Sequence, residues 1–276
     1  MKIFGCSDIH GRYELLKELV DTHLDFENND ILILLGDYVD GDRDSNSYLT
    51  LSYIYTLQQT YPNQVIALMG NHDYWLAHFI FPEMKKLDTM ITPDSCTILD
   101  FLTKEEYENI NLEAKRNSSN LVEFTNEVVR KQREVLKNKH LELFEWLRCL
   151  PMYYETKNQI FVHSGIYALE GCFDIWKEIS DENDYLMKFH DYFYDFNKMI
   201  ISGHVSTSYV SENSSFHRIY RHKNHIYLDA TVQESKRLNL LKYCPTSDTY
   251  FEIYKDENKK WVETILEETK EGKIDG

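Results

Sequence analysis

Five short motifs that contain aspartate, histidine or asparagine each follow an apolar segment of the chain. The motifs are SDIHG (7–11), GDYVD (36–40), GNHD (70–73), VHSG (162–165) and SGHVS (202–206). Carboxylates, an amide oxygen and imidazoles, without thiolates, suit Mn²⁺, Fe or Zn²⁺ rather than a structural cysteine site. Every motif also holds a glycine, which permits sharp turns and close backbone approach. The motifs therefore predict metal ligands.

The apolar segments before the motifs are predicted to be β-strands, because they are short and end at turn residues. They are residues 2–6, 30–35, 65–69, 159–162 and 198–201. Helical spacing of apolar residues over 13–24 and 48–61 places a helix after each of the first two strands. This α/β alternation brings strand ends to one edge of a sheet, where ligands bind. We therefore expect the motifs to converge although they are distant in sequence.

The chain has 276 residues and is 42% hydrophobic, which is enough for one large domain with a sizeable core. Residues 75–146 lack strand signals, so we expect a helical insertion over 76–148 within a single domain, 1–276. One or two helices are expected over 121–150, after a break at 117–120. Further strands are expected at 225–228, 238–243, 249–254 and 261–266.

Composition argues against several partners. The formal charge of -16 repels phosphate backbones, so no nucleic-acid partner is expected, although a bound metal can attract an anionic substrate locally. Five scattered cysteines without a C-x-x-C pair favour reduced thiols in a cytoplasmic protein. Acids and histidine follow the first residues too early for a signal peptide. No apolar run approaches the ~18 residues of a membrane span, so no membrane partner is expected. The oligomeric state is not predicted.

The order of the motifs resembles the calcineurin-like metallophosphoesterases, over residues 1–75 and 150–235. Asp8-Ile9-His10-Gly11 and Gly36-Asp37-Tyr38-Val39-Asp40 are similar to the phosphoprotein-phosphatase branch, in a bacterial or phage-type form with Gly-Asn-His-Asp. That branch includes serine/threonine phosphatases and diadenosine-tetraphosphate hydrolases. The resemblance implies an α/β fold, a four-layer α-β-β-α sandwich of two mixed sheets.

The resemblance also implies two divalent metal ions, with Mn²⁺ first and Fe or Zn²⁺ as alternatives. Two such ions lower the pKa of a shared water and clamp phosphate oxygens for in-line attack. In this sequence Asp8, His10 and His204 would hold the first ion, Asn71 and His163 the second, and Asp37 would bridge both.

Two further residues carry the implied proton transfer. His72 would be the general acid that protonates the leaving oxygen, and Asp40 would hydrogen-bond its ring and hold its tautomer. The resemblance thus assigns catalytic roles to His72 and Asp40.

The sequence departs from the family where an arginine normally grips the phosphate. Gly41 and Asp42 occupy the usual Arg-Gly positions, and the nearest arginine is Arg43. Arg12 is a second candidate for phosphate binding, the alternative being a solvent-facing residue at a helix start. Lys177 stands after a tryptophan where phosphatases carry another arginine, and lysine lacks the bidentate grip.

Two of the next three features have open alternatives. Asp229 is expected either to support the site from behind or to shape a turn. The aromatic run 190–196 is expected to pack in the core, or to line a nucleobase pocket. Asp42 and Asp44 are expected to be solvated loop residues.

The implied activity is hydrolysis of a phosphate monoester, as a serine/threonine-type protein phosphatase. The substrate would be a phosphorylated protein or a small phosphate ester. The alternatives are a diadenosine tetraphosphate hydrolase and, from another class, a scaffold that keeps the fold without turnover. The complete ligand set and the intact His72 favour an enzyme over the scaffold.

Overall fold

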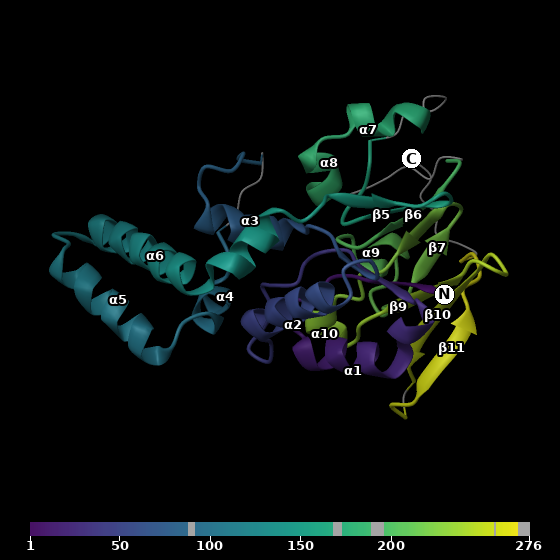
Figure 1. Ribbon diagram of the computed structural model, residues 1–276, viewed down its shortest axis with the longest axis horizontal. Coiled ribbons are helices and arrows are strands. Elements are labelled where there is room, and N and C mark those ends of the chain that lie inside the picture. The colour runs from purple at the N-terminus through teal and green to yellow at the C-terminus, as the bar shows by residue number, and fades with distance from the viewer. Residues whose placement is uncertain (88–91, 168–172, 189–195, 257, 270–276) are drawn as a thin grey trace.

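Two mixed β-sheets pack face to face and carry helices on their outer sides (Figure 1). The computed structural model describes all residues except 88–91, 168–172, 189–195, 257 and 270–276. The predicted α/β fold with two mixed sheets is confirmed.

The first sheet has six strands in the order β11-β10-β9-β1-β2-β3. Its strands are β1 (Ile3–Cys6), β2 (Ile31–Leu34), β3 (Val65–Ala67), β9 (Leu240–Cys244), β10 (Thr249–Lys255) and β11 (Trp261–Ile265). β1, β2 and β3 run parallel, and β9 pairs antiparallel with β1. The three predicted C-terminal strands therefore extend the N-terminal parallel unit on one side.

The second sheet has five strands in the order β4-β5-β6-β8-β7. They are β4 (Tyr153–Glu155), β5 (Gln159–Val162), β6 (Met199–Ser202), β7 (Tyr220–His222) and β8 (His225–Tyr227). β5, β6 and β8 are parallel, whereas β4 and β7 are antiparallel edge strands. The sequence did not predict β4 and β7, because three residues are too few to show a period of two.

The core explains why β2 is apolar on both faces. Leu32 and Leu34 point to the helical side, where they join a cluster that includes residues of α1 (Tyr13–His23) and α2 (Ser47–Thr60). Ile33 and Leu35 point the other way and pack with residues of the second sheet such as Phe161. A strand covered on both faces reads as a continuous apolar run, as observed here.

Helices dominate the segment between the two sheets. They are α3 (Asn71–Ile80), α4 (Ser95–Asp100), α5 (Lys104–Arg116) and α6 (Leu121–Arg148). α5 and α6 form a hairpin that projects from the body at the left of Figure 1, and α6 has a kink at His140. The break falls at the predicted place, because Asn120 accepts a hydrogen bond from the amide of Glu123 and caps α6. The description of 76–148 as an insertion in one domain stays an interpretation.

The remaining helices are short. They are α7 (Trp176–Ile179), α8 (Glu182–Met187), α9 (Thr207–Val210), α10 (Val232–Ser235) and the 3₁₀ turns η1 (Phe26–Asn28) and η2 (Phe173–Ile175). α7 and α8 lie over the outer face of the second sheet (Figure 1), where Trp176 and Leu186 join the core cluster that contains Val162. None of the described helices is both long and apolar enough to cross a membrane.

Tyr38 ties β2 to the end of β3. Its side chain is fully buried, and its hydroxyl lies 3.0 Å from the carbonyl oxygen of Leu34 and 2.7 Å from that of Leu68. A buried hydroxyl that reaches two carbonyls at a strand exit helps to fix where the following loop begins.

We expect Tyr38→Phe to lower the free energy of unfolding by about 1–3 kcal/mol, because the one buried hydroxyl proton that the two carbonyls share is lost. Urea denaturation followed by circular dichroism measures the change. The control is Tyr107→Phe, since Tyr107 is 40% exposed, and its effect should stay within about 0.5 kcal/mol. Equal midpoints for Tyr38→Phe and the wild type would contradict this role.

Candidate active site

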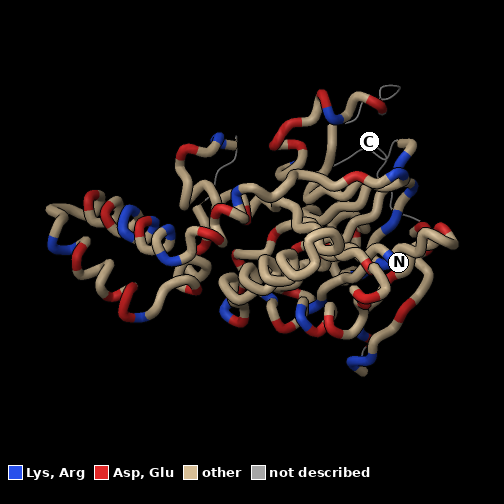
Figure 2. The backbone as a smooth tube through the Cα atoms, in the orientation of Figure 1, with Lys and Arg blue, Asp and Glu red and all other residues tan. Residues whose placement is uncertain are grey.

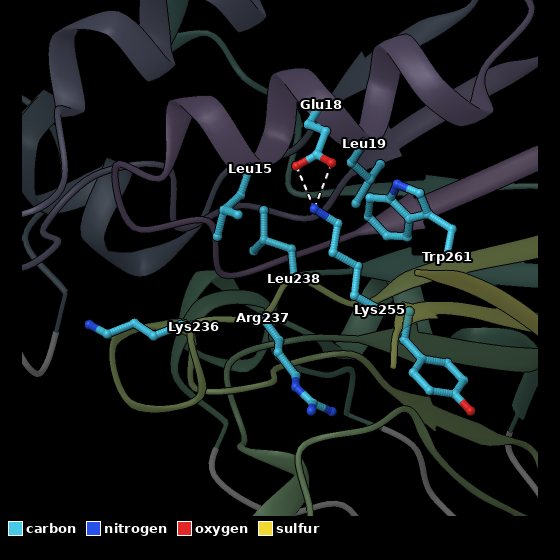
Figure 3. A pocket seen from close by; sticks show the side chains of 9 residues that line it. Leu15, Glu18, Leu19, Lys236, Arg237, Leu238, Lys255 and Trp261 are labelled. Carbon is cyan, nitrogen blue, oxygen red and sulfur yellow. Dashed lines mark hydrogen bonds and ion pairs between the residues drawn. The ribbon is translucent and has the colours of Figure 1, made fainter. Parts of the chain in front are cut away.

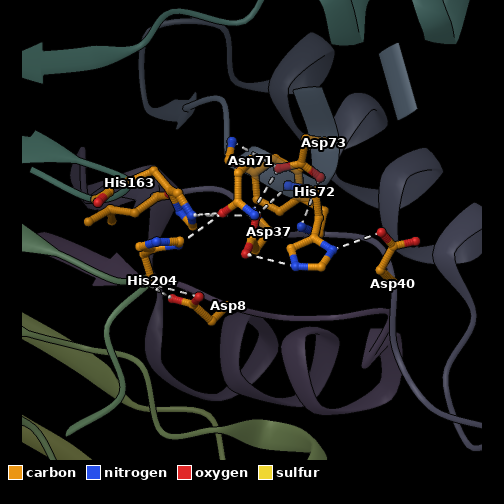
Figure 4. A network of polar contacts seen from close by, with 12 residues as sticks. Asp8, Asp37, Asp40, Asn71, His72, Asp73, His163 and His204 are labelled. Atoms are coloured by element: carbon orange, nitrogen blue, oxygen red, sulfur yellow. Dashed lines mark hydrogen bonds and ion pairs between the residues drawn. The ribbon is translucent and has the colours of Figure 1, made fainter. Parts of the chain in front are cut away.

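The five motifs meet at one edge, at the exits of β1, β2, β3, β5 and β6 (Figure 4). Asn71 and His72 lie in the first turn of α3 rather than in a loop before it. The convergence predicted from strand ends is therefore observed, across both sheets.

Asp37 lies between two groups of potential ligands. One group is His10, Asp37 and His72, and the other is Asp37, His163 and His204; within each group the ligand atoms lie within 4.8 Å of one another. Asp37 Oδ2 is 3.9 Å from His10 Nε2, and Asp37 Oδ1 is 3.5 Å from His163 Nε2. This central position suits the bridging role assigned to Asp37, which stays a prediction.

Backbone carbonyls fix the tautomers of two predicted ligands. The Nδ1 of His10 lies 3.0 Å from the carbonyl oxygen of Val39, and the Nδ1 of His163 lies 2.8 Å from that of Leu35. A carbonyl can only accept, so each Nδ1 donates to its carbonyl and each Nε2 is directed at the other predicted ligands. This is the arrangement that metal-binding histidines adopt.

His204 joins the second group of ligands. It was predicted to share an ion with Asp8 and His10, but its Nδ1 lies 3.0 Å from Asn71 Oδ1 and its ring centroid lies 5.1 Å from that of His163. Only its backbone amide reaches the Asp8 carboxylate, at 3.0 and 3.1 Å. A shared ion with Asp8 and His10 stays a prediction. The amide of Gly203 donates to the carbonyl of His163, which places the β6 exit beside the β5 exit and brings His204 close to Asn71 and His163.

Several carboxylates are buried around these histidines. Asp8, Asp37, Asp73 and Asp229 are each at most 8% exposed. Burial and the charges of Asp229 and Asp37 raise the pKa of Asp8. Burial also opposes ionisation of Asp37, but the surrounding histidines outweigh it and lower its pKa. Crowded buried carboxylates of this kind are stabilised by cations.

Burial also shifts the histidines toward their neutral forms. It lowers the pKa of His10 and of His163, and it lowers that of His204 to about 4. Neutral imidazoles and ionised carboxylates are the forms that bind metal ions. The residues present therefore fit a pair of divalent ions.

The backbone of the site is strained. Asp8, His10, Asp37, Asp40 and His204 all have φ between 45° and 61°, in the left-handed region. Hydrogen bonds between loops hold this conformation; for example, the amide of His10 donates to the carbonyl of Asp37 at 2.9 Å. Strain of this kind is retained where the surrounding structure imposes it, and it clusters at functional sites. The sequence analysis did not predict these left-handed conformations.

Asp73 is a supporting residue that the sequence interpretation missed. It is fully buried and accepts hydrogen bonds from the amides of Asp37 (2.7 Å), Tyr38 (2.9 Å) and Gly70 (3.1 Å). Burial and the charge of Asp37 raise its pKa to about 8. The available signal was an acid at the third helical position after Gly70, which is the capping-box position.

His72 is held by Asp40, as the sequence predicted for this pair. The ring Nδ1 donates to Asp40 Oδ2 at 2.7 Å, while Nε2 faces Asp37 Oδ2 at 4.0 Å. Burial lowers the pKa of His72, but the charges of Asp37 and Asp40 outweigh it and raise the pKa to about 9. The ring is therefore oriented, with its second nitrogen directed at the ligand groups (Figure 4).

The two candidate arginines differ in environment. Arg12 is buried and is not a solvent-facing residue; it donates to Asp42 Oδ2 at 2.5 Å and to the carbonyl of Asp44 at 3.1 Å. Asp42 also accepts from Lys236 at 2.8 Å, so it is not merely solvated. Arg43 is exposed. Phosphate binding by Arg12 or Arg43 stays a prediction.

The other open features have different outcomes. Asp229 accepts from the amide of Thr231 at 2.7 Å, and its charge acts on Asp8, so it shapes a turn and lies behind the site. Lys177 pairs with Glu155. The aromatic run lies outside the described residues, except Phe196, which packs in the core.

A separate hollow of about 50 Å³ lies between α1 and the strands β10 and β11 (Figure 3). Leu15, Leu19 and Leu238 give it an apolar lining, and Lys255 crosses it to bond Glu18 at 2.6 Å. It contains none of the motif residues. Within the described part of the chain, both groups of potential metal ligands lie at the edge shown in Figure 4.

Comparison with known proteins agrees with this geometry. The sequence model of the family described as calcineurin-like phosphoesterase matches residues 1–208. Serine/threonine-protein phosphatase PP1-1 of Saccharomyces cerevisiae is 31% identical over 103 residues, which are 36% of this chain and 32% of the relative. The serine/threonine-protein phosphatase 6 catalytic subunit of Caenorhabditis elegans is 40% identical over 68 residues, 25% of this chain and 20% of the relative. The chain thus spans a third or less of these curated relatives.

A solved structure supports the fold. A protein serine/threonine phosphatase from Saccharomyces cerevisiae, with similarity to human phosphatase PP5, superposes with a TM-score of 0.50 at 12% identity. The match covers 99% of this chain and 82% of that one. Because the family match extends over all five motifs that build the site, this chain belongs to the calcineurin-like phosphoesterases.

Proposed function

We propose that this chain is a metal-dependent phosphatase that hydrolyses phosphate monoesters, as a serine/threonine-type protein phosphatase. The observation that carries the proposal is the sharing of Asp37 between two ligand groups, beside a histidine oriented by Asp40. Family membership and the phosphatase relatives support it. The substrate class is a phosphorylated protein or a small phosphate ester.

The predicted ligands fit two divalent ions, with Mn²⁺ first and Fe or Zn²⁺ as alternatives. The residues that would hold them are Asp8, His10, Asp37, Asn71, His163 and His204. When bound, two such ions acidify a water and neutralise charge on phosphate oxygens.

His72 supplies the proton in this proposal. As the bond between phosphorus and the leaving oxygen breaks, the ring gives its Nε2 proton to that oxygen. Asp40 keeps the other proton on Nδ1, so the ring cannot turn away. The nearby carboxylates raise the pKa of His72, which favours the protonated ring that an acid requires at neutral pH.

The decisive assay measures phosphate release from p-nitrophenyl phosphate and from a phosphoserine peptide in the presence of Mn²⁺. We expect the wild type to release phosphate from both. Nucleotide release from diadenosine tetraphosphate at a much better rate would instead favour the alternative hydrolase. Bound metal without turnover of any substrate would favour the scaffold.

We expect His72→Asn to lower kcat by about 10²–10⁴-fold, because the reaction loses its general acid. Steady-state kinetics with p-nitrophenyl phosphate and Mn²⁺ measure the change. His78→Asn is the matched control, since His78 lies on the same helix outside both ligand groups, and it should keep wild-type kcat. A His72→Asn enzyme with wild-type kcat would contradict the assignment.

We expect Asp73→Asn to weaken Mn²⁺ binding by about 10–100-fold, because its carboxylate holds the amides of Asp37 and Gly70 in place. Isothermal titration of the metal-free protein with Mn²⁺ measures the affinity. Asp184→Asn removes the matching acid of the capping box of α8 and should leave the affinity unchanged. Equal weakening in both variants would assign the effect to general loss of stability.

A further inference from the structure

The helical segment that carries no family motif contacts the site through Asp40. Thr97 of α4 accepts a hydrogen bond from the amide of Asp40 at 3.0 Å, through its hydroxyl oxygen. The amide of Asp94, just before α4, donates to Asp40 Oδ1 at 3.0 Å. Asp40 is thus held at its backbone and at its side chain by one short stretch, about 55 residues further along the chain.

These contacts use the parts of Asp40 that His72 leaves free. The carboxylate gives Oδ2 to the ring of His72 at 2.7 Å and Oδ1 to the amide of Asp94. With both oxygens engaged, the carboxylate plane has one favourable orientation. The ring that bonds to it is fixed in the same way, since Asp40 Oδ2 sets the direction of the Nδ1–H bond.

Thr97 also anchors this arrangement in the protein interior. Its side chain is 1% exposed, and its hydroxyl lies 3.1 Å from that of Ser47 at the start of α2. The amide of Ser47 in turn donates to Asp100, the last residue of α4, at 2.7 Å. Asp40 itself has φ 61°, so its amide needs an external acceptor to hold the left-handed turn.

We propose that Thr97 and the backbone amide of Asp94 are positioning groups for the general acid His72, acting through Asp40. The inference rests on the proposed phosphatase function and adds to it a role for the segment 94–97. Neither group touches the reacting atoms. Each fixes the direction in which His72 offers its Nε2 proton.

The leaving group provides a readout that a merely structural role would not move. Water oxygen forms a new bond to phosphorus and keeps one of its protons in the hydrogen phosphate product. The old bond to the leaving oxygen breaks, and that oxygen takes its electron pair and the Nε2 proton of His72. The second water proton passes to solvent, and His72 takes a proton back from solvent before the next turnover. The phenol of phenyl phosphate is a weaker acid than p-nitrophenol, so its departure depends more on that proton. Misplacement of His72 therefore slows the hydrolysis of phenyl phosphate more than that of p-nitrophenyl phosphate.

The experiment measures the ratio of kcat on phenyl phosphate to kcat on p-nitrophenyl phosphate. Mn²⁺ content and thermal unfolding are measured for every variant. Thr97→Val removes the hydroxyl at nearly constant volume and should lower kcat on phenyl phosphate about tenfold, with a much smaller loss on p-nitrophenyl phosphate. Thr97→Ser keeps the hydroxyl and should restore the wild-type ratio. Thr50→Val, at a buried threonine of α2 that does not contact Asp40, should leave the ratio unchanged.

A second pair of variants tests the amide independently of Thr97. Asp94→Ala loses the side chain that caps α4 but keeps the amide, whereas Asp94→Pro loses both. Proline suits this position because Asp94 has φ -57°. The ratio of the two kcat values should fall further in Asp94→Pro than in Asp94→Ala, and this comparison stands even if Thr97→Val does not fold.

A double-variant cycle decides whether the effect passes through His72. In the His72→Asn background, Thr97→Val should change the ratio no further, because the acid is already absent. Equal losses on both esters, no loss in Thr97→Val, or a full additional effect without His72 would each overturn the inference. If the wild type hydrolyses neither ester, the proposed function is wrong and the inference falls with it.

Discussion

The buried carboxylate of Asp37 is the group on which the rest of the site depends. It lies among four histidines, and its electrostatic interaction with them lowers its pKa against the cost of burial. Its own charge in turn raises the pKa of its neighbours Asp8 and Asp73. A buried anion with this many titratable neighbours is stable only where cations balance it. The ligand geometry and the electrostatics therefore lead to the same conclusion, that this edge of the molecule is built to hold divalent ions.

The fold supplies this arrangement by bringing two sheets together at their strand exits. β1, β2 and β3 deliver three loops from one sheet, and β5 and β6 deliver two from the other. Glycine is required where the loops touch: a Cβ at Gly70 would lie 2.2 Å from the amide nitrogen of Asp37. The close approach of these backbones lets the Asp73 carboxylate reach the amides of both loops.

Much of the fold and of the candidate site could be predicted from the sequence, because the patterns that indicate them are local. Apolar runs ending in Asp, His or Asn located β1, β2 and β3 and the side chains beyond them. The grouping of His204 with His163 could not be predicted, since it follows from a backbone hydrogen bond between two exits that lie about 40 residues apart. The left-handed conformations of Asp8 and Asp37 could not be predicted either. Aspartate adopts both right-handed and left-handed backbone conformations, and only the packing of the loops selects one.

The contacts of α4 show why a segment without a motif can still belong to the site. A catalytic motif is recognisable because its chemistry demands particular side chains, whereas a support needs only a donor or an acceptor in the right place. The amide of Asp94 offers what any residue except proline offers, and the hydroxyl of Thr97 is matched by serine. Such positions leave no pattern in a single sequence. They become visible only when the hydrogen bonds of a strained residue such as Asp40 are traced to their partners, and here the partners lie in the segment that family resemblance left unassigned.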